Sequence, residues 1–168
     1  MADEDLVPLD LANQAKKTLD IYTEKGLTIA AAESCTGGLV AAALTSISGC
    51  SHVFKAGYIT YSNQSKTDML DVPADLIKRV GAVSPEVAEA MAASARKLAK
   101  ASAAVSVTGI AGPDGGSAEK PVGLVYIGLS TGKHTEVRKF QFQGDRSEIR
   151  RQSALKVLAW LYAAGKEL

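Results

Sequence analysis

LTIAAAESCTGGLVAAAL, residues 27–44, joins two apolar runs through a short segment of small and polar residues. The first run, LTIAAAES, is short and apolar, which is typical of a buried strand. The second run, over residues 36–48, is rich in small residues and predicts a helix for which Thr36 is a suitable N-cap. The turn between them, ESCTGG, has three interpretations: a reactive nucleophile, a phosphate-binding loop, or only a tight strand-to-helix turn.

Outward from this unit, strand-like and helix-like segments alternate along the chain. Helices are predicted where apolar residues recur at helical spacing, and strands where β-branched and aromatic residues gather. In chain order we expect a helix over 9–26, a strand over 53–62, helices over 62–70, 73–81 and 84–101, a strand over 102–109, a hairpin of 123–131 and 134–143, and a helix over 145–165. Helices separate most strands, so the order predicts a three-layer α/β/α sandwich on a mixed, mostly parallel sheet of about five strands.

Several helix ends carry their own signals. Gly26 closes the first helix, and Pro73 separates the two short helices in the middle of the chain. Ser84 is a typical N-cap and is followed by Pro85, which suits the first helical position. Asp145 is expected to cap the last helix in the same way.

Composition limits the classes of protein and partner. The chain has 168 residues, 46% of them hydrophobic and 22% charged, which fits one compact domain over residues 1–168. Nineteen basic residues face eighteen acidic ones, so we expect neither a nucleic acid nor a membrane as a partner. The first residues, MADEDLVPLD, do not resemble a signal peptide, which predicts a cytoplasmic protein. Cys35 and Cys50 are expected to be reduced and buried.

Three polar or glycine-rich segments each follow a predicted strand. They are ESCTGG (33–38), TYSNQSK (60–66) and TGIAGPDGG (108–116). In an open α/β sheet, ligands bind in the crevice at the carboxyl ends of the strands. We therefore expect these three segments to converge on one site.

The turn ESCTGG presents Ser34 at the start of a predicted helix. The amides of Thr36, Gly37 and Gly38 are candidates to stabilise an oxyanion or to bind a phosphate. The alternative, that Ser34 or Thr36 merely caps the helix, remains open on spacing alone. The segment matches neither the nucleophile elbow nor the P-loop.

A serine needs a base to act as a nucleophile. His52 and His134 are the two histidines of the chain, and surface positions are expected for both. Lys66 is the stronger candidate, because a partly desolvated lysine beside a serine can accept its proton. Ser34 and Lys66 do not form a local SxxK arrangement, and a solvated lysine on a helix is the alternative. Tyr61 and Asn63 either orient a substrate or simply finish a strand.

The loop TGIAGPDGG has four glycines in nine residues, which suits close approach of a ligand to the backbone. A turn without a ligand is the equal alternative. Near the end of the chain, the first turns of the last predicted helix carry Arg146, Arg150 and Arg151, whose positive charges are unfavourable beside the helix dipole. Their role is either to bind a phosphate or carboxylate or to form a surface salt bridge. No metal-ligand pattern is present, and no metal is predicted.

Taken together, five segments resemble the CinA C-terminal domain family. They are AESCTGG, GYITYSNQSK, GAVS, SVTGIAGPDGGSAEKPVG and GDRSEIRRQ, which stand in the order of the family and extend over roughly residues 8 to 164. The family includes stand-alone bacterial nicotinamide-nucleotide amidases. Longer members carry an amino-terminal molybdopterin-binding-like domain, and this chain resembles the stand-alone form.

The resemblance implies hydrolysis of the carboxamide of nicotinamide mononucleotide to nicotinate mononucleotide and ammonia, a step in pyridine nucleotide salvage. Ser34 would be the nucleophile and Lys66 its base, with Tyr61 and Thr108 lining the pocket. The substrate phosphate would bind Arg146. No cofactor is implied.

The two ends of such a substrate need separate sites. We expect the phosphate at the loop 109–116, which includes Gly109 and Gly112, because the oxyanion already occupies the turn after Ser34. One rival is a non-catalytic nucleotide-binding or regulatory module of the same fold. A second rival is a thiol hydrolase that uses Cys35. A homodimer is compatible with a small α/β domain.

Overall fold

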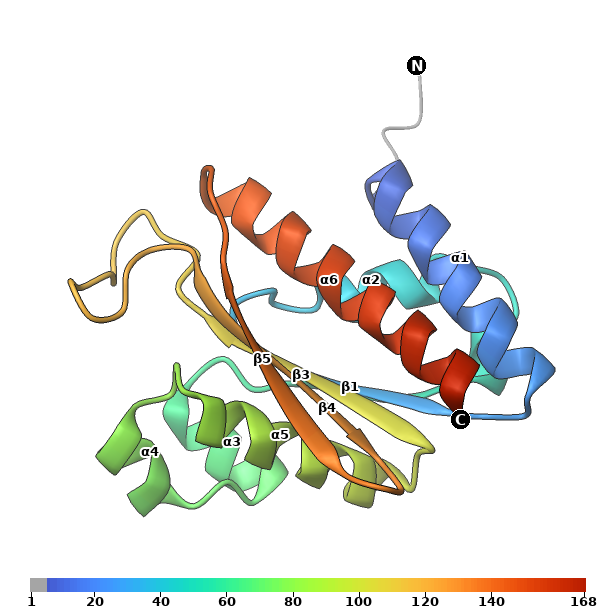
Figure 1. Ribbon diagram of the computed structural model, residues 1–168, viewed down its shortest axis with the longest axis horizontal. Coiled ribbons are helices and arrows are strands. Elements are labelled where there is room, and N and C mark those ends of the chain that lie inside the picture. Colours follow the sequence, from blue (N-terminus) through green and yellow to red (C-terminus); the bar gives the residue numbers. More distant parts are fainter. Residues whose placement is uncertain (1–5) are drawn as a thin grey trace.

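The computed structural model describes residues 6–168 as one five-stranded sheet between two layers of helices (Figure 1). The strands are β1 Ile29–Glu33, β2 Phe54–Ile59, β3 Ala103–Gly109, β4 Leu124–Thr131 and β5 Thr135–Gln141. The helices are α1 Leu9–Glu24, α2 Leu39–Thr45, α3 Asn63–Leu70, α4 Ala74–Val80, α5 Pro85–Ala99 and α6 Arg146–Glu167, with a short 3₁₀ helix η1 Cys50–His52. The expected order of helices and strands is confirmed.

The sheet has the strand order β2-β1-β3-β4-β5. Strand β1 runs parallel to both β2 and β3, whereas β4 is antiparallel to both β3 and β5. All strands except β4 therefore point the same way, which confirms the mixed, mostly parallel sheet. The chain leaves β1 for one edge and returns to β3 on the other side of β1. A crevice for ligands forms at the carboxyl ends of strands where the strand order reverses in this way.

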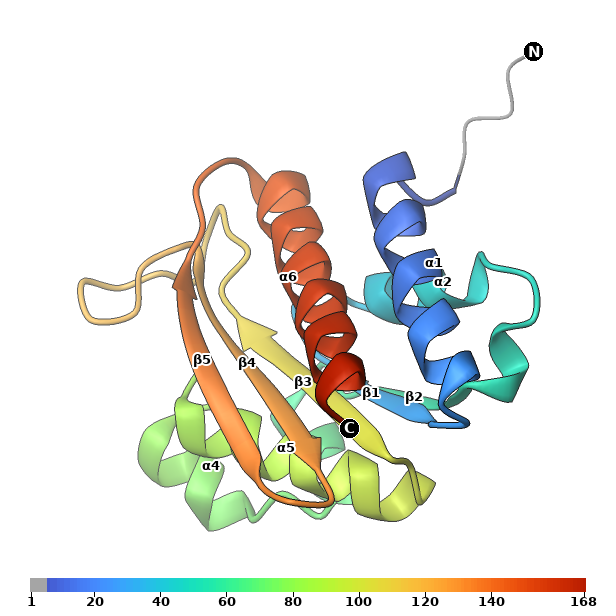
Figure 2. The same cartoon turned by 45° about the vertical axis from the view of Figure 1, so that its right-hand side comes forward.

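Helices α1, α2 and α6 cover one face of the sheet, and α3, α4 and α5 cover the other (Figure 1). Seen from a second direction, α6 lies beside α1 across the same face (Figure 2). Strands β1 and β3 are covered on both faces, so nearly all of their residues are buried. This explains why β1 reads as a continuous apolar run instead of an alternating one.

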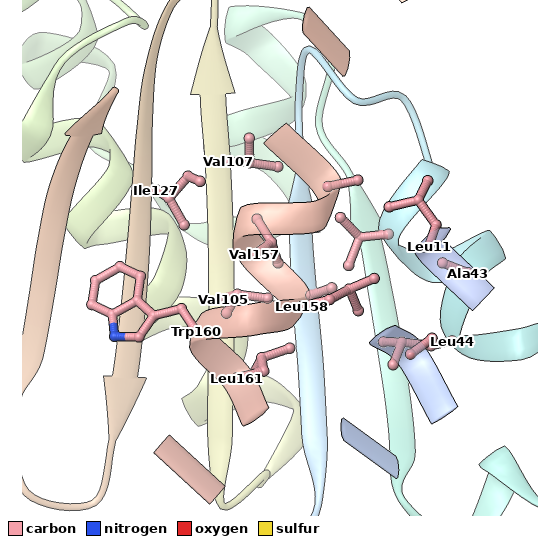
Figure 3. Close-up of a cluster of buried hydrophobic side chains, with 14 of the residues drawn as sticks. Leu11, Ala43, Leu44, Val105, Val107, Ile127, Val157, Leu158, Trp160 and Leu161 are labelled. Carbon is pink, nitrogen blue, oxygen red and sulfur yellow. The ribbon is translucent and has the colours of Figure 1, made fainter. Parts of the chain in front are cut away.

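The larger core lies between the sheet and the layer that contains α6. Figure 3 shows Val157 and Leu158 of α6 directed toward the sheet, where Val105 of β3 and Ile127 of β4 lie. The helix α2 contributes Val40, Ala43 and Leu44 to this core. Such packing holds the strand ends in place, and this fixes where the polar segments that follow the strands begin.

Two of the predicted helix caps are confirmed. The Ser84 hydroxyl accepts the amide of Val87 at 3.3 Å, and the Asp145 carboxylate accepts the amide of Glu148 at 2.8 Å. The prediction that Thr36 caps a helix over 36–48 is wrong. Helix α2 begins only at Leu39, because the turn before it has positive φ angles at Gly37 (58°) and Gly38 (98°).

The two cysteines differ in burial. Cys35 is buried and Cys50 is partly exposed, and both are free thiols. His52 and His134 are exposed, as predicted. None of the helices within residues 6–168 has the length and apolar content that crossing a membrane requires. The acidic first five residues lie outside the described part of the chain.

Candidate active site

A cavity of about 280 Å³ opens at the carboxyl ends of β1, β2 and β3. Its wall contains residues of all three predicted segments, so their convergence is confirmed. The lining residues are Ser34, Cys35, Tyr61, Asn63, Lys66, Ala82, Val83, Thr108, Gly109, Ile110, Ala111, Gly112, Asp114, Gly115 and Arg146. A larger cavity of about 340 Å³ between α1 and α2 is lined by no titratable side chain among the described residues, so we place the chemistry in the first one.

Ser34 and Lys66 form the centre of this cavity. The Lys66 Nζ atom lies 3.0 Å from the Ser34 Oγ atom and donates a second hydrogen bond to the Thr60 carbonyl oxygen at 2.7 Å. The Lys66 side chain is almost fully buried, with 1% of its surface exposed. Burial lowers the pKa of Lys66 from 10.5 to about 8, because a charged ammonium is poorly solvated there. A lysine in this state can exchange a proton near neutral pH.

The start of α3 explains why Lys66 points inward. Ser62 and Ser65 form a capping box, in which each hydroxyl accepts the backbone amide of the other residue at 3.0 to 3.1 Å. This pair sets the first turn of α3 directly after β2. Lys66 follows in the next position and lies against the strand ends. The expected alternative of a solvated lysine is therefore wrong.

Glu33 organises the turn that follows β1. Its carboxylate accepts the Thr36 hydroxyl at 2.6 Å and the amides of Gly38, Val40 and Ala41 at 3.0, 3.1 and 2.8 Å. The cap of α2 is thus a strand residue, and Thr36 is a donor to it. We did not identify Glu33 from the sequence, although a carboxylate at the end of an alanine-rich buried run is itself a signal, since it must find partners there.

The amides of this turn are not all free. The Gly37 amide donates to the Ser34 carbonyl oxygen at 3.0 Å, and the Gly38 amide donates to Glu33. The expectation that both amides face a ligand is therefore wrong, because each already has an acceptor. Within residues 6–168, the amides of Cys35 and Thr36 donate to no other residue. These two remain as donors beside the Ser34 hydroxyl.

Cys35 is a poor nucleophile in this position. Only 6% of the residue is exposed, and burial raises the pKa of its thiol to about 12. The negative charge of Glu33 adds to the shift. Since the thiolate is the reactive form of cysteine, this argues against the thiol-hydrolase alternative.

Arg146, the first residue of α6, lines the same cavity. It donates to the Gly112 carbonyl oxygen at 2.8 Å and to the Tyr61 hydroxyl at 2.9 Å. A guanidinium has five N–H donors, so these two contacts orient the side chain and leave further donors. The other candidate arginines differ: Arg150 donates to the Thr36 carbonyl oxygen at 2.8 Å, and Arg151 forms salt bridges with Asp10 and Glu148.

The glycine-rich loop lines the cavity beside Arg146. A Cβ atom on Gly109 would lie 2.6 Å from Val125, and one on Gly112 would lie 2.6 Å from Val122. These two glycines are thus already required for the loop to pack against Val125 of β4 and Val122 before it. Thr108, at the end of β3, donates its hydroxyl to the Ala82 carbonyl oxygen at 2.9 Å and so ties the cavity wall to the segment before α5.

Residues 6–168 contain no cluster of three or more His, Cys, Asp or Glu side chains placed to hold a metal ion.

Comparison with known proteins identifies the family. The family model of the CinA C-terminal domain matches residues 11–164. A CinA-like protein of Citrifermentans bemidjiense is 55% identical over 141 residues, which are 84% of this chain and 34% of that relative. The chain therefore spans about a third of the length of the curated relatives it matches.

Solved structures agree with this match. The competence/damage inducible protein CihA from Agrobacterium tumefaciens is 42% identical, with a TM-score of 0.91 over 95% of this chain and 98% of that one. A CinA superfamily protein from Klebsiella pneumoniae is 27% identical, with a TM-score of 0.90 over 94% and 99% of the two chains. On both sequence and structure, this chain belongs to the CinA C-terminal domain family.

Proposed function

We propose that this chain hydrolyses the carboxamide of nicotinamide mononucleotide to nicotinate mononucleotide and ammonia. The observation that carries the proposal is the 3.0 Å contact between the buried Lys66 Nζ atom and the Ser34 Oγ atom. The choice of substrate rests on the resemblance of the site segments to the nicotinamide-nucleotide amidases of the family. The names of the relatives state no reaction.

In the first step Lys66, in its neutral form, accepts the proton of Ser34 while the Oγ atom attacks the carboxamide carbon. The tetrahedral intermediate carries a negative charge on the former carbonyl oxygen. The unpaired amides of Cys35 and Thr36 are the donors for that oxyanion. They replace Gly37 and Gly38 in this role, because the amides of both glycines are already occupied.

In the second step the Lys66 ammonium gives its proton to the departing nitrogen, and ammonia leaves. A water molecule then attacks the acyl carbon and transfers a proton to Lys66, which restores the Ser34 hydroxyl and releases the carboxylic acid. Lys66 thus acts in turn as base and acid, and a pKa of about 8 suits both roles. Each of these proton transfers passes through Lys66.

The phosphate of the substrate is assigned to the part of the cavity that Arg146 and the glycine-rich loop line. Arg146 retains free N–H donors there, and the amides of Ala111, Gly112 and Gly115 have no acceptor within the described residues. Together they resemble the mixture of guanidinium and backbone amides that binds phosphate in other proteins. Tyr61 and Thr108 line the space between phosphate and carboxamide.

A coupled ammonia assay with nicotinamide mononucleotide tests the proposal. Ser34→Ala should abolish ammonia release while calorimetry still detects substrate binding, because only the nucleophile is lost. Ser94→Ala, on the partly exposed side of α5, is the control and should keep full activity. Near-normal turnover by Ser34→Ala would remove this serine from the mechanism. Binding without ammonia release by the unaltered chain would favour the nucleotide-binding or regulatory module.

A further inference from the structure

Glu33 is the one acidic residue that is buried within residues 6–168, with no measurable exposed surface. A carboxylate is rarely buried unless it is paired or hydrogen-bonded. Glu33 ends β1 and directly precedes Ser34, the proposed nucleophile. Burying a carboxylate costs free energy, so its position next to the proposed nucleophile requires an explanation.

Glu33 accepts hydrogen bonds from four donors, which all belong to the turn after Ser34 or to the first turn of α2. They are the Thr36 hydroxyl and the amides of Gly38, Val40 and Ala41, at 2.6 to 3.1 Å. The first amides of a helix lack partners within the helix and need an outside acceptor. The residue in the N-cap position, Gly38, has no side chain to provide one. The strand residue Glu33 therefore supplies it.

These contacts determine which amides of the turn stay unpaired. Glu33 holds the turn at Thr36 and Gly38, and Arg150 holds the Thr36 carbonyl oxygen from the side of α6 at 2.8 Å. With the turn held at both sides, its Cys35 and Thr36 amides are the only ones that donate to no other described residue.

We infer that Glu33 is a positioning residue, which holds the Cys35 and Thr36 amides where they can stabilise the oxyanion formed when Ser34 attacks. The inference rests on the proposed function. Hydrogen bonds to a buried charge are stronger than those between neutral groups, and an unpaired partner is costly in a low-dielectric interior. The turn therefore resists the small shifts that would move its free amides. The same four donors also offset the negative charge of Glu33, which would otherwise repel an oxyanion nearby.

The test is Glu33→Gln, which keeps the size of the side chain. One glutamine atom can still accept, but its NH₂ group must meet at least one backbone N–H, so the turn has to shift. We expect kcat to fall about tenfold to hundredfold, somewhat less than the loss of a complete oxyanion donor, with KM changed by less than about threefold. The milder Thr36→Val removes one donor, keeps the backbone amide, and should lower kcat by a smaller factor.

Thr18→Val is the matched control for stability. The Thr18 hydroxyl is also fully buried and donates to the Leu158 carbonyl oxygen at 3.0 Å, in a contact between α1 and α6. The control should lower thermal stability and leave kcat unchanged. If Glu33→Gln keeps kcat within twofold, or raises only KM, the inference is wrong. The same holds if kcat in the control falls as far as in Glu33→Gln at equal loss of stability.

Two further measurements separate this inference from the proposed function. Hydrogen exchange of the Gly38, Val40 and Ala41 amides should become faster in Glu33→Gln, whatever the substrate is. Labelling of Ser34 by a fluorophosphonate, followed by mass spectrometry, should slow about tenfold or more in Glu33→Gln and not in Thr18→Val. If the unaltered chain is labelled but releases no ammonia from the mononucleotide, only the proposed substrate fails. Unchanged labelling in Glu33→Gln, or no labelling in the unaltered chain, overturns the inference.

Discussion

The pH dependence of ammonia release should report the lowered pKa of Lys66. The neutral amine is the active form, so kcat/KM should rise as the pH passes through the pKa of about 8. Between pH 7 and pH 9 the neutral fraction grows from about 10% to about 90%, an increase of roughly tenfold. Above pH 9 the rate should level off.

An unperturbed lysine would give a different curve. With a pKa of 10.5 the neutral fraction would rise roughly a hundredfold over the same interval, with no plateau below pH 10. The assay is the initial rate of ammonia release from nicotinamide mononucleotide at low substrate concentration between pH 6 and pH 10. Lys78→Met removes an exposed lysine of α4 and should leave the profile unchanged.

The free energy of unfolding should also depend on pH through Lys66. The pKa of Lys66 is lower in the folded chain than in the unfolded one, so the unfolded chain binds more protons between pH 8 and about 10.5. Stability therefore rises with pH across this window, by up to about 3 kcal/mol from Lys66 alone. Below pH 8 the full penalty of the buried ammonium is present. Lys66→Met should then be more stable than the unaltered chain by about 1 kcal/mol, once two lost hydrogen bonds of about 1 kcal/mol each are subtracted.

Three results would refute this reasoning. A rate that keeps rising in proportion to hydroxide up to pH 10 would mean that Lys66 keeps an ordinary pKa. A variant Lys66→Met with substantial ammonia release would mean that Lys66 is not the base. A rise in KM alone would make it a binding group instead.

Two other predictions concern the remaining groups of the cavity. Arg146→Ala should raise KM for the mononucleotide about tenfold or more while changing KM for the phosphate-free riboside little, because a phosphate contact is lost. The control is Arg151→Ala, which breaks only the surface salt bridges. Equal effects of Arg146→Ala on nucleotide and riboside would disprove the phosphate assignment. Iodoacetamide at pH 8 should leave the initial rate unchanged, since the Cys35 thiol stays protonated there. Rapid inactivation, together with a Cys35→Ala variant that releases no ammonia, would instead support the thiol hydrolase.

Much of the fold follows from local patterns. The strand β1 is recognisable as an apolar run, and the caps at Ser84 and Asp145 are recognisable because an N-cap side chain bonds to an amide only three residues away. The convergence of the three polar segments also follows, since parallel strands place their carboxyl ends at one edge of a sheet.

The predictions from sequence are wrong where a hydrogen-bond partner comes from another helix or strand. Thr36 looks like a helix cap because its type and place fit, yet the acceptor at the start of α2 is the carboxylate of Glu33. The glycine amides looked free for the same reason. Hydrogen-bond partners in a turn are decided by which side chain reaches it, and the residue types of the turn alone do not contain that information.

The α/β architecture, the family and the candidate residues could be predicted from the sequence, because periodicity, caps and motif order are properties of neighbouring positions. The 3.0 Å contact between Lys66 and Ser34 results from the folded arrangement, because 32 positions separate the two residues in the chain. The same arrangement brings Arg146 to the cavity, whereas Arg151 pairs at the surface. The lowered pKa of Lys66 belongs to the same class of property, because desolvation arises from the atoms that pack around a group and not from those next to it in sequence.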